Sequence, residues 1–168
     1  MKPPLRGPEI FTDAHDVSLF DCGNDALNRF LQRHALNNQR NQSARTYVAL
    51  RGETRVVGFY TMAAASAEFD FVPTRIAKGL ARHPIALTLL ARLGVDSTEQ
   101  GAGLGTGLLK DALKRFIQAQ AIIAARAIVV QAKDDRASAF YRHFGFAPSP
   151  IDPYHLFLMT KDIHESLQ

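Results

Sequence analysis

A glycine-rich segment between residues 100 and 107 constrains this chain more than any other part of it. Glycines stand at positions 101, 103, 105 and 107, and an apolar run that ends at Val95 precedes them. An amphipathic pattern follows directly, so the segment is expected to join a buried strand to a helix. Glycine lets a backbone approach an anion closely, and the first N–H groups of a helix attract negative charge. The segment therefore predicts a site for a phosphate or pyrophosphate group.

Three nucleotide-binding patterns compete for this segment. A P-loop requires Gly-Lys-Ser/Thr, and no such lysine follows. A Rossmann fingerprint requires an acidic residue about twenty positions later, where this chain has Ala, Arg and Ile. The third pattern, Gln/Arg-x-x-Gly-x-Gly/Ala, is met in full by residues 100–105. It resembles the pyrophosphate loop of the GNAT superfamily of acyl-CoA-dependent N-acetyltransferases, and the remaining alternative is a glycine-rich turn without a ligand.

Length, composition and cysteine content are those of an ordinary globular protein. The chain of 168 residues is long enough for a sizeable core, so we expect one domain over residues 1–168. Its single cysteine, Cys22, excludes an internal disulfide framework. No signal peptide, membrane span or metal site is predicted. These features predict a cytoplasmic protein that does not bind a membrane.

The charged residues are biased toward arginine. Fourteen of the twenty basic residues are arginine, and sixteen acidic residues leave a net charge of +4. The planar guanidinium group suits phosphate recognition better than an ammonium group does. The surplus therefore indicates a polyanionic second substrate, although solvated surface charges explain the composition equally well.

Hydrophobic periodicity and turn residues predict alternating strands and helices. In the first half, the expected elements are a strand near 9–12, a helix that follows an N-cap at Asn24 and ends near 43, strands at 45–50 and 56–62 that form a hairpin, and one short helix within 66–84. In the second half, we expect a strand at 85–95, a helix from 104 to about 124, a strand at 127–132, a helix at 135–143 capped by Asp134, and a strand at 154–160. This order predicts an α/β protein with a mixed, mostly antiparallel sheet flanked by helices. The GNAT fold has the same order.

A second motif lies in the aromatic segment 139–146. Its phenylalanines are expected to belong to the core, but the pattern F-Y-x-x-x-G-F resembles the GNAT segment whose tyrosine hydroxyl lies near the CoA sulfur. The resemblance implies a catalytic role for Tyr141. A phenol with a pKa near 10 can hydrogen-bond to, or protonate, a leaving thiolate whose parent pKa is about 8.5. The alternative is a packing residue whose hydroxyl faces water.

The same resemblance implies acetyl-CoA as the cofactor. The residues expected to bind it are Leu93, Val95, Gln100, Gly101, Ala102, Gly103, Leu104, Gly105, Thr106 and Ser138.

No carboxylate is singled out as a general base. Glu99 directly precedes the loop, and its simplest interpretation is a solvated side chain. A lysine side chain, with a pKa of about 10.4, needs more help to lose its proton than an α-amino group near 7.7–8.0. The absence of an evident base therefore favours an α-amine as the acceptor.

The N-terminal half and the closing segment are similar to those of TacT-like GNAT toxins. The similar segments are Phe20–Gly23, Ala26–Leu31, Ala35, Asn38–Gln39, Ala44–Val48 and Ala147–Pro153. The resemblance implies the toxin of a type II toxin–antitoxin pair, which acetylates the α-amino group of the amino acid on charged tRNA and is neutralised by a ribbon-helix-helix antitoxin. We also expect a homodimer. Where the loop of that subfamily often begins with arginine, this chain has Gln100.

Basic residues in two parts of the chain are candidates for tRNA phosphate contacts. They are Arg29, Arg33 and Arg40 in the first helix, and Arg75, Lys78, Arg82 and Arg92 in the connection and the strand after it.

Three other functions stay open on sequence alone. A GNAT enzyme that acetylates a small-molecule or protein amine would share the loop and Tyr141 but would not require the segment 20–38. An acyl-CoA sensor would bind the cofactor without turnover. A plain nucleic-acid-binding module would have no use for the glycine-rich segment.

Overall fold

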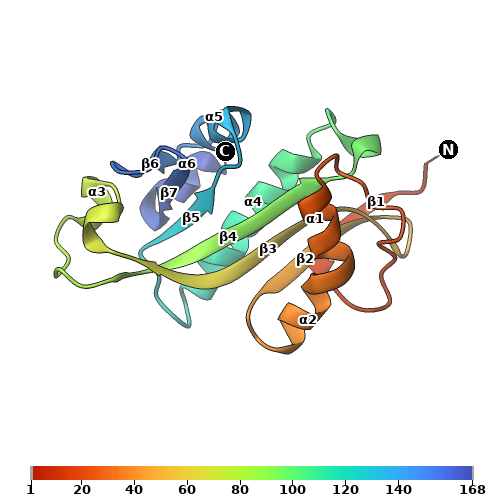
Figure 1. Cartoon of the computed structure of the whole chain (residues 1–168), viewed down its shortest axis with the longest axis horizontal. Coiled ribbons are helices and arrows are strands. Elements are labelled where there is room, and N and C mark those ends of the chain that lie inside the picture. The colour runs from red at the N-terminus through yellow and green to blue at the C-terminus, as the bar shows by residue number, and fades with distance from the viewer. Residues whose placement is uncertain (1, 168) are drawn as a thin grey trace. The chain divides into compact units, whose positions relative to one another are not determined.

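The computed structural model describes residues 2–167, and its strands form one sheet in the order β1-β2-β3-β4-β5-β7-β6 (Figure 1). The strands are β1 (Leu5–Ile10), β2 (Arg45–Arg51), β3 (Arg55–Ala67), β4 (Ile85–Val95), β5 (Ala127–Gln131), β6 (Ala147–Pro148) and β7 (His155–Met159). β1 with β2, β2 with β3, β5 with β7 and β6 with β7 pair antiparallel, whereas β4 and β5 are parallel. This is the mixed, mostly antiparallel sheet that the sequence predicts.

The helices are α1 (Asp25–Arg29), α2 (Ala35–Arg40), α3 (Thr74–Ala77), α4 (Leu104–Ala119), α5 (Asp135–His143) and α6 (Ile163–Ser166). A π-helix covers Phe30–His34, and 3₁₀ turns cover Phe69–Phe71, Ser97–Glu99 and Thr160–Asp162. No helix among residues 2–167 combines the length and the apolar character needed to cross a membrane.

The chain divides into two compact units. Unit 1 contains the residues up to Ala63 together with Ala91–Ala112, and unit 2 contains Ala64–Leu90 and the residues after Ala112. Three elements, β3, β4 and α4, run from one unit into the other.

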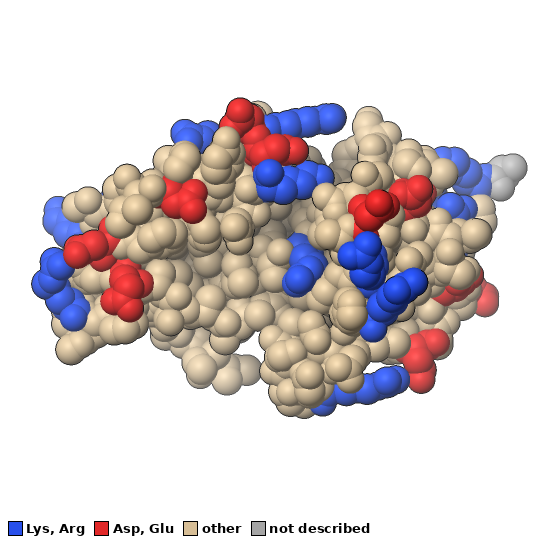
Figure 2. All heavy atoms as spheres, viewed as in Figure 1, with Lys and Arg blue, Asp and Glu red and all other residues tan. Residues whose placement is uncertain are grey.

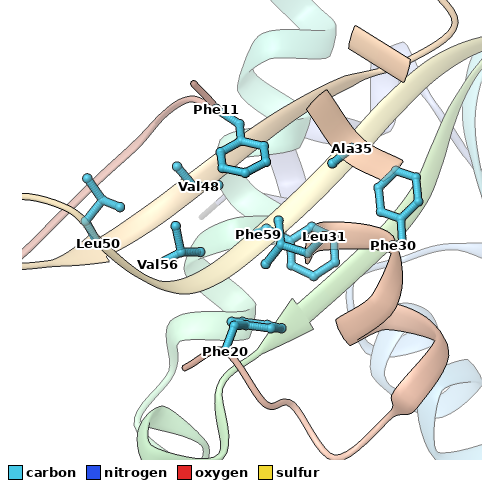
Figure 3. Close-up of a cluster of buried hydrophobic side chains, with 9 residues drawn as sticks. All are labelled: Phe11, Phe20, Phe30, Leu31, Ala35, Val48, Leu50, Val56 and Phe59. Carbon is cyan, nitrogen blue, oxygen red and sulfur yellow. The ribbon is translucent and has the colours of Figure 1, made fainter. Parts of the chain in front are cut away.

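The core of unit 1 lies between its strands and the first helices. It consists of Phe11, Phe20, Phe30, Leu31, Ala35, Val48, Leu50, Val56 and Phe59. Figure 3 shows Phe59 of β3 among side chains that come from the segment before α1 and from the π-helix. The Phe59 ring lies 5.5 Å from that of Phe20 and 6.4 Å from that of Phe30, centroid to centroid. The segment 20–35 therefore covers one face of this part of the sheet.

The predicted helix after Asn24 consists of three pieces. Its N-cap is confirmed, because the Asn24 side chain accepts a hydrogen bond from the N–H of Leu27 (3.0 Å). The prediction of a continuous helix to residue 43 is wrong, since the Ala35 N–H donates to the carbonyl of Phe30, five residues back, and the helix ends at Arg40. The wider π turn lets Phe30 and Ala35 both face the core, which 3.6-residue periodicity alone does not anticipate.

Unit 2 packs α3 and its flanking segments against β5 and β7. Its core comprises Val72, Ile76, Ala77, Ile85, Leu87, Ala127, Val129, Phe157 and Met159. The predicted helix to about residue 124 ends earlier, at Ala119, and Ile122 and Ile123 beyond it are 91% and 74% exposed. Their apolar side chains extend the hydrophobic pattern but have no surface to pack against. β6 and α6 were not predicted, because two and four residues are too few to show a period.

Candidate active site

The glycine-rich loop of unit 1 lies between the end of β4 and the start of α4. Gly101 and Gly103 have φ angles of +83° and +89°, which favour glycine, and a Cβ at either would meet nothing within 4 Å. The Gly107 N–H donates to the Gly103 carbonyl (3.0 Å) and closes the first turn of α4. The N–H groups of Leu104 and Thr106 therefore have no acceptor inside the helix. Backbone donors beside open space fit a pyrophosphate group.

The end of β4 turns alternate side chains toward α4. A Cβ added at Gly105 would lie 3.7 Å from Cγ2 of Val95, so Val95 faces the start of α4. Leu93 lies two residues earlier and shares that face. Unit 1 thus brings the predicted cofactor residues of β4 and of the loop together.

The opposite face of β4 carries Arg92 and Gly94. A Cβ at Gly94 would lie 3.0 Å from Cε1 of Phe59, so this position has room only for hydrogen. The guanidinium carbon of Arg92 lies 3.8 Å from the centre of the Phe30 ring. Burial lowers the pKa of Arg92, and its side chain has no carboxylate partner among residues 2–167. It is a cation on an aromatic face, available to an anionic ligand.

Asp96 fixes the turn that leads from β4 into the loop. Its buried carboxylate accepts hydrogen bonds from the N–H groups of Asp21 (2.9 Å) and Thr98 (3.0 Å) and from the Thr98 hydroxyl (2.6 Å). The Ser97 N–H in turn donates to the carbonyl of Asp21 (2.8 Å). Burial alone would raise the pKa of Asp96, but these hydrogen bonds and the Arg55 guanidinium, 3.8 Å away, outweigh it and lower the pKa.

Gln100 connects the loop to the same N-terminal segment. Its amide Nε2 donates to the carbonyl oxygens of Val95 (2.9 Å) and Cys22 (3.2 Å). Cofactor contact by Gln100 remains a prediction, and the amide nitrogen already holds the loop in place. The segment Phe20–Gly23, which the sequence marked only by resemblance, therefore docks onto the loop entrance through its backbone.

Glu99 is a buried partner in an ion pair. The prediction of a solvated side chain is wrong, because Glu99 is 6% exposed. Its carboxylate accepts from Nη2 of Arg51 at 2.8 Å and from Nε of Arg51 at 3.2 Å, and Nζ of Lys2 lies 3.5 Å away. The hydrogen bond from Arg51 lowers the pKa of Glu99. The partner lies 48 residues away along the chain, so no local pattern indicates this pair.

Tyr141 and Ser138 lie on α5, in unit 2. Asp134 caps this helix as predicted, since its side chain accepts from the Ala137 N–H (2.8 Å). The Tyr141 ring is 9% exposed and packs 5.5 Å from that of Phe146. Burial raises the pKa of Tyr141 to about 12. Its hydroxyl has no hydrogen-bond partner within residues 2–167, so it is available to a ligand.

Ser138 is buried one turn before Tyr141. Its hydroxyl accepts a hydrogen bond from Nε of Arg142 (3.3 Å), so it already has one partner within α5.

The predicted tRNA-binding cations of the first helices are exposed. Arg29, Arg33 and Arg40 lie on α1, the π-helix and α2, where Figure 2 shows basic side chains gathered on the surface. Arg40 approaches a carboxylate, that of Asp13, only to 4.0 Å. Arg29 and Arg33 have no such partner in the described chain.

The cations of the connection in unit 2 have acidic neighbours. Arg75 pairs with both carboxylate oxygens of Asp162, and Arg82 lies 2.8 Å from a carboxylate oxygen of Asp70. Lys78 is exposed. Within this predicted set, Arg75 and Arg82 are therefore less available to a phosphate than the cations of unit 1.

Comparison with known proteins identifies the class that this loop and fold define. The family described as the acetyltransferase (GNAT) domain matches residues 42–148. The chain belongs to this family. It is also 44% identical, over 92% of each chain, to a curated protein of Mycobacterium tuberculosis named tRNA-acetylating toxin, and so shares a family with that toxin.

Solved structures of the toxin AtaT have the same fold. A complex of AtaT with acetyl-methionyl-tRNAfMet superposes with a TM-score of 0.87 at 30% identity, and covers 98% of this chain and 99% of that chain. A tyrosine-to-phenylalanine mutant of AtaT bound to acetyl-CoA and the C-terminus of the antitoxin AtaR gives a TM-score of 0.80 at 30% identity over 96% of each chain. These matches confirm the predicted GNAT fold.

Proposed function

We propose that this chain is a toxin that transfers the acetyl group of acetyl-CoA to the α-amino group of the amino acid on charged tRNA, which blocks translation. The observation that carries this proposal is the 44% identity to the tRNA-acetylating toxin, because it extends over 92% of the chain. The open glycine loop of unit 1 and the unpartnered Tyr141 hydroxyl of unit 2 supply the two features that an acetyltransferase needs.

The loop residues 101–106 hold the pyrophosphate of acetyl-CoA in this proposal. Gly101 and Gly103 fit the group because a side chain at either position would fill the space beside the backbone donors. Leu93 and Val95 extend the site along β4, and Ser138 of α5 is the cofactor-binding residue proposed for unit 2. When bound, acetyl-CoA supplies an acetyl group that is already activated as a thioester.

Tyr141 stabilises the leaving sulfur by hydrogen bonding. With a pKa of about 12, its hydroxyl keeps its proton at neutral pH and can donate it to a thiolate. The parent thiol has a pKa of about 8.5, so complete proton transfer from the phenol is unfavourable. Tyr141 therefore acts mainly as a hydrogen-bond donor.

The carboxylates next to the loop support an α-amine acceptor. Asp96 is held by Thr98 and by the backbone of Asp21, and Glu99 is held by Arg51. Neither is free to remove a proton from a lysine. An α-amino group, with a pKa near 7.7–8.0, is partly neutral at physiological pH without such a base.

The exposed cations of α1 and the π-helix contact tRNA phosphates in this proposal. Arg29 and Arg33 stand on that surface, and Arg92 lies over Phe30 beneath it. Such contacts position a polyanion without reading its sequence.

We further propose a cytoplasmic homodimer whose activity is blocked by a ribbon-helix-helix antitoxin, and that residues 1–168 form one domain. The AtaT structure with the C-terminus of AtaR supports an antitoxin partner. The family match over residues 42–148 draws on both compact units, which supports one domain.

Labelled acetyl-CoA tests the proposal directly. The purified protein is incubated with it and with total charged tRNA, uncharged tRNA, or free amino acids. We expect label only on charged tRNA, released when the aminoacyl ester is hydrolysed. Label on free amines would contradict the toxin proposal and indicate an ordinary GNAT enzyme. Cofactor binding without label on any acceptor would indicate an acyl-CoA sensor.

A further inference from the structure

A cavity of about 710 Å³ lies wholly within unit 2. It is bounded by the start of β4, the segment before β5 and the end of β7. Leu80, Pro84, Ile85 and Met159 give it apolar walls. Its size and its mostly apolar lining are those of small-ligand sites.

The ionisable side chains that line this cavity all belong to basic residue types. They are His83, Arg126, Lys161 and His164. The side chains of His83, Lys161 and His164 have no hydrogen bond or ion pair with any other part of residues 2–167. Of the acidic residues that flank Lys161 and His164 in sequence, Asp162 interacts electrostatically with Lys161 but makes its hydrogen bonds and ion pair with Arg75, and Glu165 lines a different cavity.

Arg126 is held in place at the cavity by backbone oxygens. Its Nε donates to the carbonyl of Ile76 (2.9 Å), and one terminal nitrogen, Nη2, donates to that of Lys78 (3.3 Å). The second terminal nitrogen, Nη1, has no partner in the described chain. A half-buried guanidinium fixed in this way presents its remaining donors without a large loss of side-chain entropy.

We propose that this cavity is a second binding site, for a nucleotide. The cations recognise its phosphate, and the imidazole rings and apolar walls pack against its base. The same chemistry is offered by a free mononucleotide and by an unpaired nucleotide of an RNA chain. The site is independent of the proposed acetyltransferase activity, because none of its residues belongs to the glycine loop or to α5.

NMR of the histidine side chains tests this site in the full-length protein. Acetyl-CoA is added at a stoichiometric concentration to occupy the glycine loop, and an excess is avoided because its own adenine nucleotide could compete for the cavity. The protein is then titrated with 5′-AMP, adenosine or single-stranded tetraadenylate. We expect 5′-AMP or tetraadenylate to shift the imidazole resonances of His83 and His164, and adenosine to bind at least tenfold more weakly because it lacks phosphate.

Two matched variants separate a specific site from general attraction by positive charge. Lys161→Gln removes a cation from the lining, and Lys133→Gln removes an exposed lysine of unit 2 that lies outside it. We expect about tenfold weaker binding in the first and a change of less than about twofold in the second. Equal weakening in both variants, or no shift of His83 and His164 with either phosphate-bearing ligand, would overturn the proposal. Shifts with tetraadenylate alone would assign the site to RNA. An affinity for 5′-AMP similar to that for tetraadenylate would assign the site to free nucleotides.

Discussion

Burial acts on one ionisable group in each of the two compact units, with opposite results. Asp96 beside the glycine loop and Tyr141 on α5 are both buried, and burial alone would raise the pKa of each. Asp96 receives hydrogen bonds from Thr98 and Asp21, so its pKa falls below the ordinary value and it stays charged. The Tyr141 ring has aromatic neighbours and its hydroxyl has no hydrogen-bond partner within residues 2–167, so the proton of the hydroxyl is retained.

This difference separates a structural anchor from a group that can act on a ligand. The bonds of Asp96 are already made, and they fix the entrance to the loop. The hydroxyl of Tyr141 keeps its hydrogen-bonding capacity for a ligand. The unmade hydrogen bond of the Tyr141 hydroxyl is therefore as informative about function as the bonds that Asp96 has made.

The largest expected effect is on stability, from Asp96→Ala. The change leaves the N–H groups of Asp21 and Thr98 without their acceptor and removes one of the carboxylates near Arg55. We expect the free energy of unfolding in urea to fall by about 3 kcal/mol. Asp152→Ala, which removes a carboxylate with two hydrogen bonds in a more exposed position, is the control and should cost less than about 1 kcal/mol. Equal losses of unfolding free energy in Asp96→Ala and Asp152→Ala would show that the burial of Asp96 does not make its hydrogen bonds more important for stability than those of an exposed carboxylate.

Tyr141→Phe should lower the turnover number about a hundredfold and leave the affinity for acetyl-CoA within about twofold. The ring and its packing are kept, and only the hydroxyl, which has no partner among residues 2–167, is lost. Steady-state kinetics together with calorimetric acetyl-CoA binding measures both quantities. Tyr154→Phe is the control, because that hydroxyl is already bonded to Asp135 (2.7 Å). Unchanged turnover in Tyr141→Phe would remove the proposed role.

Gly103→Ala should weaken acetyl-CoA binding about tenfold. The methyl group meets no protein atom, so any effect beyond the backbone cost comes from the space that a ligand needs. Gly79→Ala is the control, because Gly79 has a φ of +82° and equally open surroundings but lies outside the loop. It should show only the backbone cost of a side chain at a positive φ, about 1–2 kcal/mol of stability. Similar cofactor affinities in the two variants would mean that the loop does not approach the pyrophosphate.

The pH dependence of stability should differ between the two groups. The folded pKa of Tyr141 is about 12, above the value near 10 expected when unfolded, so the unfolded state loses its proton first as the pH rises. Stability from this group is complete below pH 10 and is lost between about pH 10 and 12, with a loss of about 1 kcal/mol at pH 10.5.

For Asp96 the sign is reversed, because its folded pKa is lowered and its contribution disappears only as the pH falls below about 4. Urea unfolding of Tyr141→Phe and Asp96→Asn across both pH ranges checks this difference. Each variant should lose only its own pH dependence, and an alkaline loss that persists in Tyr141→Phe would assign it to another group.

The smallest effect is expected from the surface cations. Arg29→Gln combined with Arg33→Gln should lower the affinity for charged tRNA about threefold and reduce the salt slope by about 2, because both side chains lack carboxylate partners. Arg75→Gln combined with Arg82→Gln removes the same charge from paired positions and should change affinity less. A larger loss in the second pair, measured by filter binding over a salt series, would move the tRNA surface to unit 2.

The mixed sheet class and the glycine-rich turn before α4 were predicted, because both follow from local patterns. The first strand was expected near 9–12 but covers Leu5–Ile10, and β6 was missed. Glycines at alternate positions and the capping residues Asn24 and Asp134 act within a few residues of themselves. The π-helix was not predicted, since it depends on Phe30 and Ala35 packing together against a sheet that forms from later residues.

The polar anchors of the loop could not be predicted for the same reason. Apart from local bonds of Asp96 and Gln100, the partners of Asp96, Glu99 and Gln100 lie between 41 residues away (Arg55 from Asp96) and 97 residues away (Lys2 from Glu99). The sequence also did not show which basic side chains are free to bind a phosphate, because the ion pair between Arg75 and Asp162 forms only in the folded chain. Residue types in a sequence do not reveal which charges already have a partner.

The bonds from Asp21 and Cys22 to the loop also set an order of events during synthesis. These bonds span 75 and 78 residues, so the N-terminal segment can pack on β3 through Phe20 and Phe59 earlier but cannot hold the loop until residue 100 has emerged from the ribosome. A nascent chain that stops earlier can form the β2–β3 hairpin but has no anchored acyl-donor loop. Premature termination in the first half of the message therefore yields fragments without a cofactor site.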